Sequence, residues 1–128
     1  MRQFAKVNPQ LWGKKTFKSM SQEAKLALLY FLSSPHQTSA GCCRLPDAYA
    51  SSDLGWHIDV YVKARKEVEA AEFIVFDEDE EELYVRGWFQ DNPTTNEKHK
   101  HGCLRIIGSL NSEKIYTIAE EEICSLCA

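Results

Sequence analysis

The side chains best suited to bind a metal ion lie near the C-terminus. Cys124 and Cys127 form a Cys-x-x-Cys pair, which presents two thiolates from one turn of chain, and His99, His101 and Cys103 could complete a tetrahedron. A structural zinc site usually draws on two such pairs, and a single pair beside a lysine-rich His-x-His arises readily by chance. We therefore predict no metal site and no cofactor.

Six consecutive carboxylates at residues 77–82 are the second concentration of titratable groups. Their spacing lacks the glycine and terminal glutamate of an EF-hand, so it does not indicate a calcium site. General acid catalysis needs a carboxyl group in an apolar setting, which this run does not provide. The chain also lacks a Gly-rich phosphate-binding loop and a G-x-S-x-G motif. We expect no enzyme activity and interpret the run as a solvated turn.

Basic side chains are the third group, and they are unevenly distributed. Residues 1–66 carry a local net charge of +6 and residues 67–128 one of −10, within a total of −4. This asymmetry predicts a basic face and an acidic face. Flexible lysine side chains can contact the phosphate oxygens of DNA, and the N-terminal candidates are Lys14, Lys15 and Lys18. An ordinary solvated basic surface remains the alternative.

Residues 57–71 contain the other basic candidates. Their apolar residues recur at intervals of three and four, which predicts a helix with one packed face made by Tyr61, Ala64, Val68 and Ala71. If this is the second helix of a helix-turn-helix, its N-terminal part and outer face reach the bases. The candidate DNA contacts are then His57, Val62, Lys63, Arg65 and Lys66. A solvated helix face has the same pattern, so both interpretations stay open.

The elements that position these residues predict an α+β, mainly helical fold. Ser21 is a suitable N-cap for a helix over residues 22–33. Before it, residues 3–7 are interpreted as a short edge strand and Trp12 as a core residue. Residues 42–45 are predicted to form a strand that pairs with the base of a hairpin, and Arg44 within it is a further candidate DNA contact.

A helix-turn-helix and a hairpin follow this strand. Pro46 suits the first position of a helix that ends at Leu54, and Gly55 permits the left-handed backbone of a tight turn. Residues 73–76 and 83–85 form two β-rich runs around the acidic turn. The order predicts a winged helix-turn-helix with a short β-hairpin wing over residues 1–90. Because the carboxylates repel phosphate, we expect this wing not to enter DNA.

Residues 91–128 are predicted to form a helical C-terminal extension. HKHGCLRIIGSL is interpreted as one helix, and a second begins after Ser112 with Ile115, Ile118, Ala119 and Ile123 at helical spacing. Such amphipathic helices favour a homodimer or a protein partner. The chain has no apolar run of the roughly 18–20 residues that a membrane span needs, and no secretion signal at its start. We expect a cytoplasmic protein with reduced thiols and no membrane partner.

Two segments carry a family resemblance. CRLPDAYASSDLGW and VKARKEVEAAEFIVFDEDEEELYVRGWF resemble the winged-helix segment of phage-encoded replication proteins, similar to the N-terminal domain of DnaD-like replication initiators and phage replisome organisers. The resemblance covers about residues 3–92 and implies a DNA-associated role in replication or regulation. The chain departs from it at Glu72, where such segments commonly have glycine, and at Arg65, where the residue is usually apolar.

These observations lead to one functional expectation and one alternative. We expect a DNA-binding winged-helix protein of phage or prophage origin that acts in replication initiation or transcriptional regulation. The alternative is a protein–protein interaction module with the same fold that does not itself bind DNA. Salt dependence separates the two, because contacts with several phosphates weaken steeply as salt is added.

Overall fold

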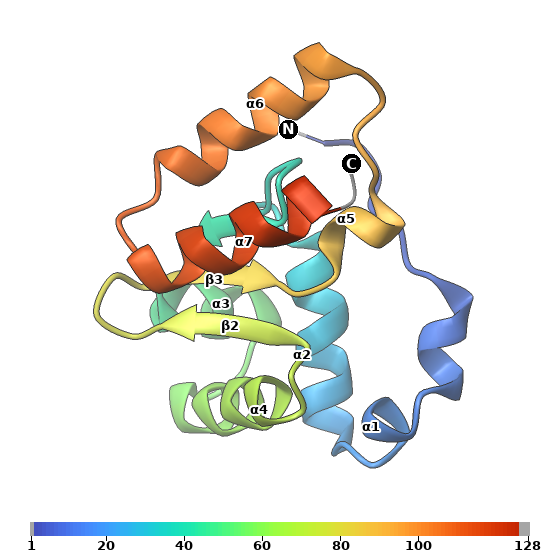
Figure 1. Cartoon of the computed structure of the whole chain (residues 1–128). Helices are drawn as coiled ribbons and strands as arrows, with labels where there is room; N and C mark the ends of the chain where they lie inside the picture. The colour runs from blue at the N-terminus through green and yellow to red at the C-terminus, as the bar shows by residue number, and fades with distance from the viewer. Residues whose placement is uncertain (1, 126–128) are drawn as a thin grey trace.

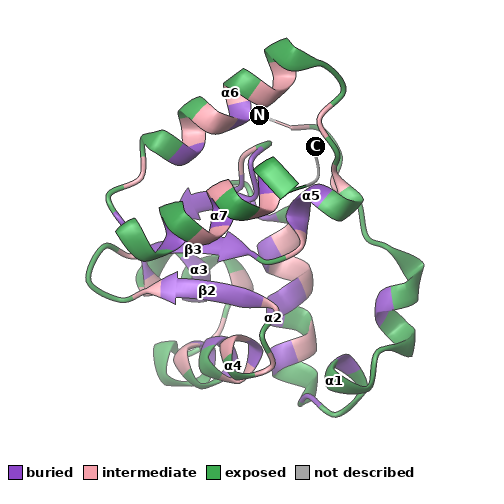
Figure 2. Ribbon diagram, viewed as in Figure 1, coloured by how far each residue is buried: buried purple, intermediate pink, exposed green. Residues whose placement is uncertain are grey.

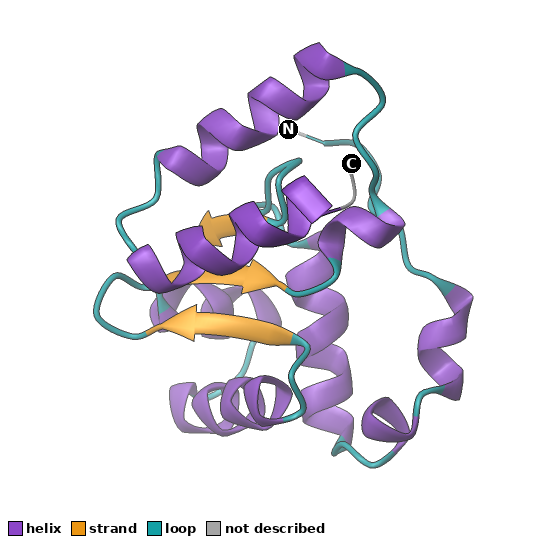
Figure 3. Ribbon diagram, in the orientation of Figure 1, coloured by secondary structure: helices purple, strands orange, loops and turns teal. Residues whose placement is uncertain are grey.

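Helices make up most of the structure, a computed structural model that describes residues 2–125 (Figure 1). This is an α+β, mainly helical fold, as the sequence predicted (Figure 3). The elements follow one another in this order: η1 (Pro9–Gly13), α1 (Lys15–Lys18), α2 (Gln22–Ser33), β1 (Cys42–Arg44), α3 (Asp47–Leu54), α4 (Ile58–Ala70), β2 (Ile74–Asp77), β3 (Glu82–Val85), α5 (Trp88–Asp91), α6 (Glu97–Gly108) and α7 (Glu113–Ser125).

The three strands form an antiparallel sheet in the order β1-β3-β2. Cys42 lies opposite Tyr84 in the β1–β3 pair, and Val75 lies opposite Tyr84 on the other side. All four residues of β3 are buried. Because successive strand residues point to opposite faces, both faces of the sheet must be covered. The register of the two strand pairs confirms the predicted hairpin and its pairing with β1.

Helices cover the sheet from two sides (Figure 1). α2 and α4 pack against each other, α3 packs on α4, and α4 leads directly into β2. α7 lies along β2 and β3, and three apolar side chains on one of its faces are fully buried: Ile115, Ala119 and Ile123 (Figure 2). The predicted helices of the C-terminal extension thus exist, and one of their faces joins the same core as the preceding elements.

The predicted helix start at residue 22 is confirmed. Ser21 adopts an extended backbone, and its hydroxyl accepts a hydrogen bond from Ala24 N at 3.1 Å. Ser112 caps the N-terminus of α7 in the same way, since its hydroxyl accepts a hydrogen bond from Ile115 N at 3.2 Å. α3 begins at Asp47 with Pro46 as its N-cap, one residue later than the sequence indicated.

The N-terminal prediction was wrong in two respects. Residues 3–7 form no strand, because Arg2 Nη2 donates to Leu32 O at 3.2 Å and this start of the chain lies along the end of α2 instead of a sheet edge. Trp12 is not a core residue, since it is 57% exposed. Leu11 and Phe17 occupy the core positions of this segment instead.

The interpretation of residues 77–82 as a fully solvated turn also needs correction. Glu78, Asp79 and Glu80 are exposed, but Glu82 is only 5% exposed. Its carboxylate accepts hydrogen bonds from the backbone N–H groups that precede α7. A carboxylate at a helix N-terminus meets both free N–H donors and the positive end of the helix dipole.

Glu72 ends α4 in a conformation that glycine adopts more readily. Its φ is +66°, and it occupies the left-handed position of a Schellman motif, in which Phe73 N donates to Val68 O and Glu72 N donates to Glu69 O. A residue with a Cβ atom is strained there. The glycine that the family resemblance places at this position therefore has a physical explanation.

Glu72→Gly is expected to raise the free energy of unfolding by about 1 kcal/mol, because it relieves the left-handed strain. Urea denaturation followed by circular dichroism measures the change. Glu72→Ala is the matched control, since it removes the same carboxylate but retains a Cβ atom. Equal stability of the glycine and alanine variants would show that the backbone conformation carries no cost.

Candidate nucleic-acid interface

α4 carries most of the candidate DNA contacts, and a tight turn fixes its starting point. Gly55 has a φ of +71° and ends α3, as predicted, while Trp56 N donates to Ser51 O at 3.0 Å. His57 is then the N-cap of α4, and its Nδ1 accepts from Asp59 N at 3.3 Å. The imidazole thus has a local structural role at the point where the sequence predicted a base contact.

The packed face of α4 agrees with the predicted periodicity. Three of its four predicted members are at most 2% exposed: Tyr61, Ala64 and Val68. They face α2, where the rings of Phe31 and Tyr61 meet edge to face with centroids 6.3 Å apart. This packing determines which side chains of the helix point away from the body of the protein.

The outer face of α4 brings together four of the five helix candidates. Lys63 and Lys66 are exposed, and neither has a carboxylate within 4.0 Å among residues 2–125. The His57 side chain is 73% exposed, and Val62 is half-buried against the core. The two lysines are therefore free to meet an anionic partner.

Arg65 lies elsewhere, and the prediction that it contacts DNA needs correction. Its side chain is 2% exposed, its Nε lies 3.1 Å from Asp47 Oδ1, and its guanidinium lies 4.1 Å from the ring centroid of Phe76. Burial between α3, α4 and β2 makes it a structural residue. Its position inside the fold agrees with the apolar residue that the resemblance places there.

The hollow between α4 and the β2–β3 turn is acidic. It has a volume of about 370 Å³, and its lining includes Asp47, Glu78, Glu81 and Lys66. Arg44 is exposed, and its guanidinium lies 3.4 Å from Glu81 Oε1. The carboxylate partner lowers the positive charge that Arg44 can offer to phosphate, so the interior of this hollow disfavours a nucleic-acid backbone.

The lysines of the N-terminal segment lie beside the opposite, C-terminal half of α4. Ser21 N and its hydroxyl donate to the Glu67 carboxylate at 2.6 and 2.8 Å, which ties the segment to α4. These hydrogen bonds lower the pKa of Glu67. Lys14, Lys15 and Lys18 are all exposed, and α1 lies at the same end of α2 as α4 (Figure 1).

The residues considered for zinc do not converge within residues 2–125. No group of three His, Cys, Asp or Glu side chains is placed there to hold a metal ion, and Cys127 lies outside the described residues. Cys103 is fully buried with its Sγ 3.7 Å from Ser39 O, whereas Cys124 is exposed. His99 accepts a hydrogen bond from Thr95 N at 3.0 Å.

Neither a family model, a curated protein nor a solved structure matches this chain. Among the helices of residues 2–125, none is both long and apolar enough to cross a membrane.

Proposed function

We propose that this chain is a winged-helix protein that binds double-stranded DNA and acts in phage or prophage replication initiation or transcriptional regulation. The observation that carries the proposal is the order of the elements: helix α2, strand β1, helix α3, a tight turn at Gly55, helix α4, and the β2–β3 hairpin. Winged helices use this arrangement to present the helix after the turn to a DNA groove. The family resemblance of residues 3–92 supports the same interpretation.

The proposed contact surface consists of the outer face of α4 and the lysines beside it. Lys63 and Lys66 meet the duplex from α4, and His57 lies at the N-terminal end of the helix. Lys14, Lys15 and Lys18 extend the positive surface past the C-terminal end. The acidic hollow keeps the β2–β3 turn away from phosphate, and Arg65 is excluded because it is buried.

Lys63→Ala with Lys66→Ala is expected to weaken binding to a DNA duplex about tenfold or more at low salt. Each lysine that neutralises a phosphate also contributes about 1 to the slope of log affinity against log salt, so the slope should fall by about 2. Fluorescence anisotropy of a labelled duplex, titrated at several salt concentrations, measures both quantities.

The control is Lys98→Ala with Lys100→Ala, which removes the same charge from α6. This control is expected to retain the affinity and nearly the full salt slope. The proposal fails if the two double variants bind equally, or if the unmodified chain shows no duplex binding at low salt.

A second candidate function is protein binding without DNA, and one observation favours it. Ile58 and Val60 are each 43% exposed on α4, the same helix from which Val62 and Lys66 line the acidic hollow. Apolar and acidic surfaces at one helix suit a basic amphipathic segment of another protein. Under this alternative, Lys63→Ala leaves the partner's affinity unchanged, whereas Ile58→Ser with Val60→Ser lowers it.

A further inference from the structure

Trp12 heads a row of aromatic rings on the N-terminal segment. It is 57% exposed, and its ring meets Phe17 edge to face with centroids 5.1 Å apart. Phe17 in turn meets Phe73 at 6.5 Å, also edge to face. The Trp12 indole can therefore be open to a ligand while its contact with Phe17 holds the ring in position. An exposed indole without a partner would otherwise expose apolar surface to water.

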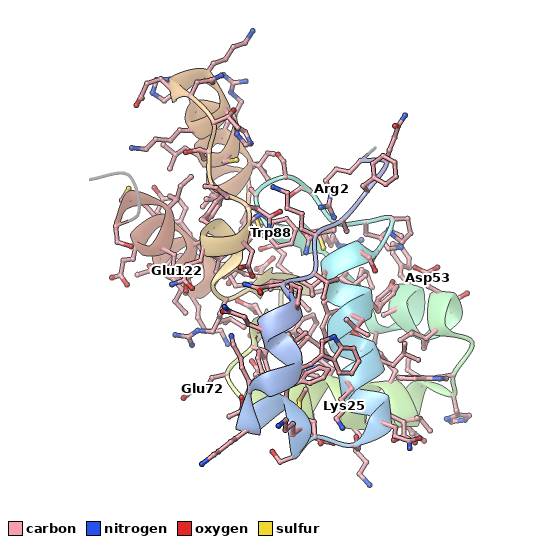
Figure 4. All side chains as sticks on the ribbon, turned by 90° about the vertical axis from the view of Figure 1, so that its right-hand side faces the viewer. Arg2, Lys25, Asp53, Glu72, Trp88 and Glu122 are labelled. Atoms are coloured by element: carbon pink, nitrogen blue, oxygen red, sulfur yellow. The ribbon has the colours of Figure 1, made fainter. Side chains whose placement is uncertain are left out.

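Lysines flank this row on both sides. Lys14 Nζ lies 5.8 Å from the centroid of the Phe73 ring, and Lys25 Nζ lies 5.8 Å from that of Phe17 (Figure 4 labels Lys25). Residues 1–20 contain five basic side chains and no carboxylate. None of these lysines has a carboxylate within 4.0 Å among residues 2–125. The row is therefore set in a positive surface.

A groove of about 290 Å³ lies between the N-terminal segment and the β3–α5 connection. Its floor is apolar and includes Leu11 and Phe73. Its rim combines cationic and carboxamide side chains: Lys6, Lys14, Arg86, Asn8, Gln10 and Gln90. Carboxamides can both donate to and accept from the edge of a nucleobase, although Asn8 is already engaged, because its Nδ2 donates to Asp91 and its Oδ1 accepts from Gln10 N. The groove and the aromatic row share Phe73 and Lys14. Phe17, which links Trp12 to Phe73, is 1% exposed and supports the two rings from beneath.

Three carboxylates lie near this surface: Asp91 and Glu122 accept hydrogen bonds, and Glu72 is exposed. Asp91, the acidic residue in the groove lining, accepts from Asn8 Nδ2 at 3.0 Å. Glu122 lines an adjoining hollow, but it accepts from the Tyr84 hydroxyl at 2.6 Å and from Gly87 N at 2.8 Å. These donors are uncharged, so the carboxylates keep their charge. The groove lining is net positive because it contains Lys6, Lys14 and Arg86 against Asp91.

We infer that this surface binds single-stranded nucleic acid, with an unpaired base stacked on Trp12 and the backbone phosphates held by Lys6, Lys14 and Arg86. An aromatic platform beside a basic groove is the combination by which proteins hold single strands. A duplex keeps its bases stacked inside the helix and cannot offer one to Trp12. An acidic peptide could satisfy the lysines but would not use the indole face or the carboxamides.

The inference goes beyond the proposed function and does not depend on it. Duplex binding relies chiefly on Lys63 and Lys66 of α4, whereas this surface relies on Trp12 and the groove, and Lys14 belongs to both surfaces. Figure 4 shows the N-terminal segment that forms the groove edge running from Arg2, beside Trp88, down to the level of Lys25. Lys63 and Lys66 belong only to the duplex surface and Trp12 only to this one, so variants at these positions test the two surfaces separately.

The test is a titration of the full chain with a fluorescein-labelled oligothymidylate of about 15 nucleotides. Anisotropy gives the affinity, and an unlabelled strand quenches Trp12 fluorescence, since Trp88 is 3% exposed and Trp56 is partly buried. Trp12→Ala is expected to weaken binding about tenfold. Trp12→Phe retains a stacking ring, so it should keep most of the affinity and lose most of the quenching.

Two further variants separate stacking from charge. Lys6→Ala with Lys14→Ala is expected to reduce the slope of log affinity against log salt by about 0.7 for each phosphate that is no longer neutralised. Tyr116→Ala removes a 40% exposed aromatic side chain from α7 and is expected to bind like the unmodified chain. Circular dichroism melting of each variant verifies that the fold is intact.

Several results would overturn the inference. These are no binding at low salt, equal binding by Trp12→Ala and Tyr116→Ala, or competition by polyglutamate as effective as competition by an unlabelled strand. The last result would assign the surface to an acidic protein. Lys63→Ala with Lys66→Ala should leave single-strand affinity unchanged within about twofold, so failure of the duplex proposal is distinguishable from failure of this one.

Discussion

Asp47→Ala is expected to lower the free energy of unfolding by about 3 kcal/mol, because it leaves the buried Arg65 guanidinium without its principal counter-charge. Arg65 Nε lies 3.1 Å from Asp47 Oδ1, and Nη2 lies 3.4 Å from Oδ2. The Arg65 side chain is 2% exposed, so its charge is poorly solvated without this carboxylate. The remaining acidic neighbour, Glu78, stands 3.9 Å from Nη1 and is itself 65% exposed.

Replacing both charges should restore most of this stability. Arg65→Met fills a similar volume over the Phe76 ring without a charge to desolvate, and buried ion pairs exchanged for apolar groups are often neutral in stability. The double variant Asp47→Ala with Arg65→Met is therefore expected to be more stable than Asp47→Ala alone. Urea denaturation of the four proteins of this double-mutant cycle gives the coupling directly.

The matched control is Arg44→Ala, which breaks an ion pair whose side chains are 58% and 43% exposed. An exposed pair of this kind contributes at most about 1 kcal/mol. If Asp47→Ala and Arg44→Ala cost the same, the buried pair does not stabilise the fold in the manner described. The same comparison bears on DNA binding, because weaker binding by an Arg65 variant would follow from damage to the fold and not from a direct role of Arg65 at the DNA.

Glu82→Ala is expected to lower the free energy of unfolding by about 3 kcal/mol, since each hydrogen bond to a buried charged group contributes about 1.5–3 kcal/mol. The Glu82 carboxylate accepts from Asn111 N at 3.0 Å and from Ser112 N at 2.8 Å. Both donors precede α7, whose N-terminus carries partial positive charge. Removing the carboxylate leaves the buried Ser112 N–H and the part-buried Asn111 N–H without this acceptor.

Glu82→Gln separates charge from shape. The amide oxygen can still accept a hydrogen bond, so the expected decrease in stability is smaller, about 1–2 kcal/mol. Glu80→Ala is the control, since Glu80 is exposed in the same turn and its substitution should change stability by less than about 0.5 kcal/mol. Thermal unfolding followed by circular dichroism measures all three. Equal effects at positions 80 and 82 would contradict the anchoring of the turn to α7.

Local sequence signals were enough to predict most elements of this fold. Ser21 marked the start of α2, Gly55 marked the end of α3, and the spacing of Tyr61, Ala64 and Val68 identified the packed face of α4. These signals act within a few residues along the chain. A cap, a left-handed turn or a helical stripe has the same physical basis in any tertiary setting.

The failures of prediction all involved partners distant in sequence. Trp12 and Leu11 are both large apolar residues, and only packing decided that Leu11 enters the core while Trp12 faces outward. Residues 3–7 had strand-like character, but a strand needs a sheet edge beside it, and the hydrogen bond from Arg2 to Leu32 O holds this segment at the end of α2. Propensity alone cannot report which element a segment will lie against.

The candidate site shows the same division between local and distant information. Sequence alone identified α4 and the basic N-terminal segment as the places where an anionic ligand could bind, because charge and helical period are readable from neighbouring residues. Tertiary structure decided which of these charges are free: Arg65 is neutralised by Asp47, 18 positions away, and Glu82 is engaged by the start of α7, about 30 positions away. Whether a side chain is free for a ligand or stabilises the fold depends on the residues that pack beside it. Those residues can be distant in the sequence, so the sequence alone does not identify them.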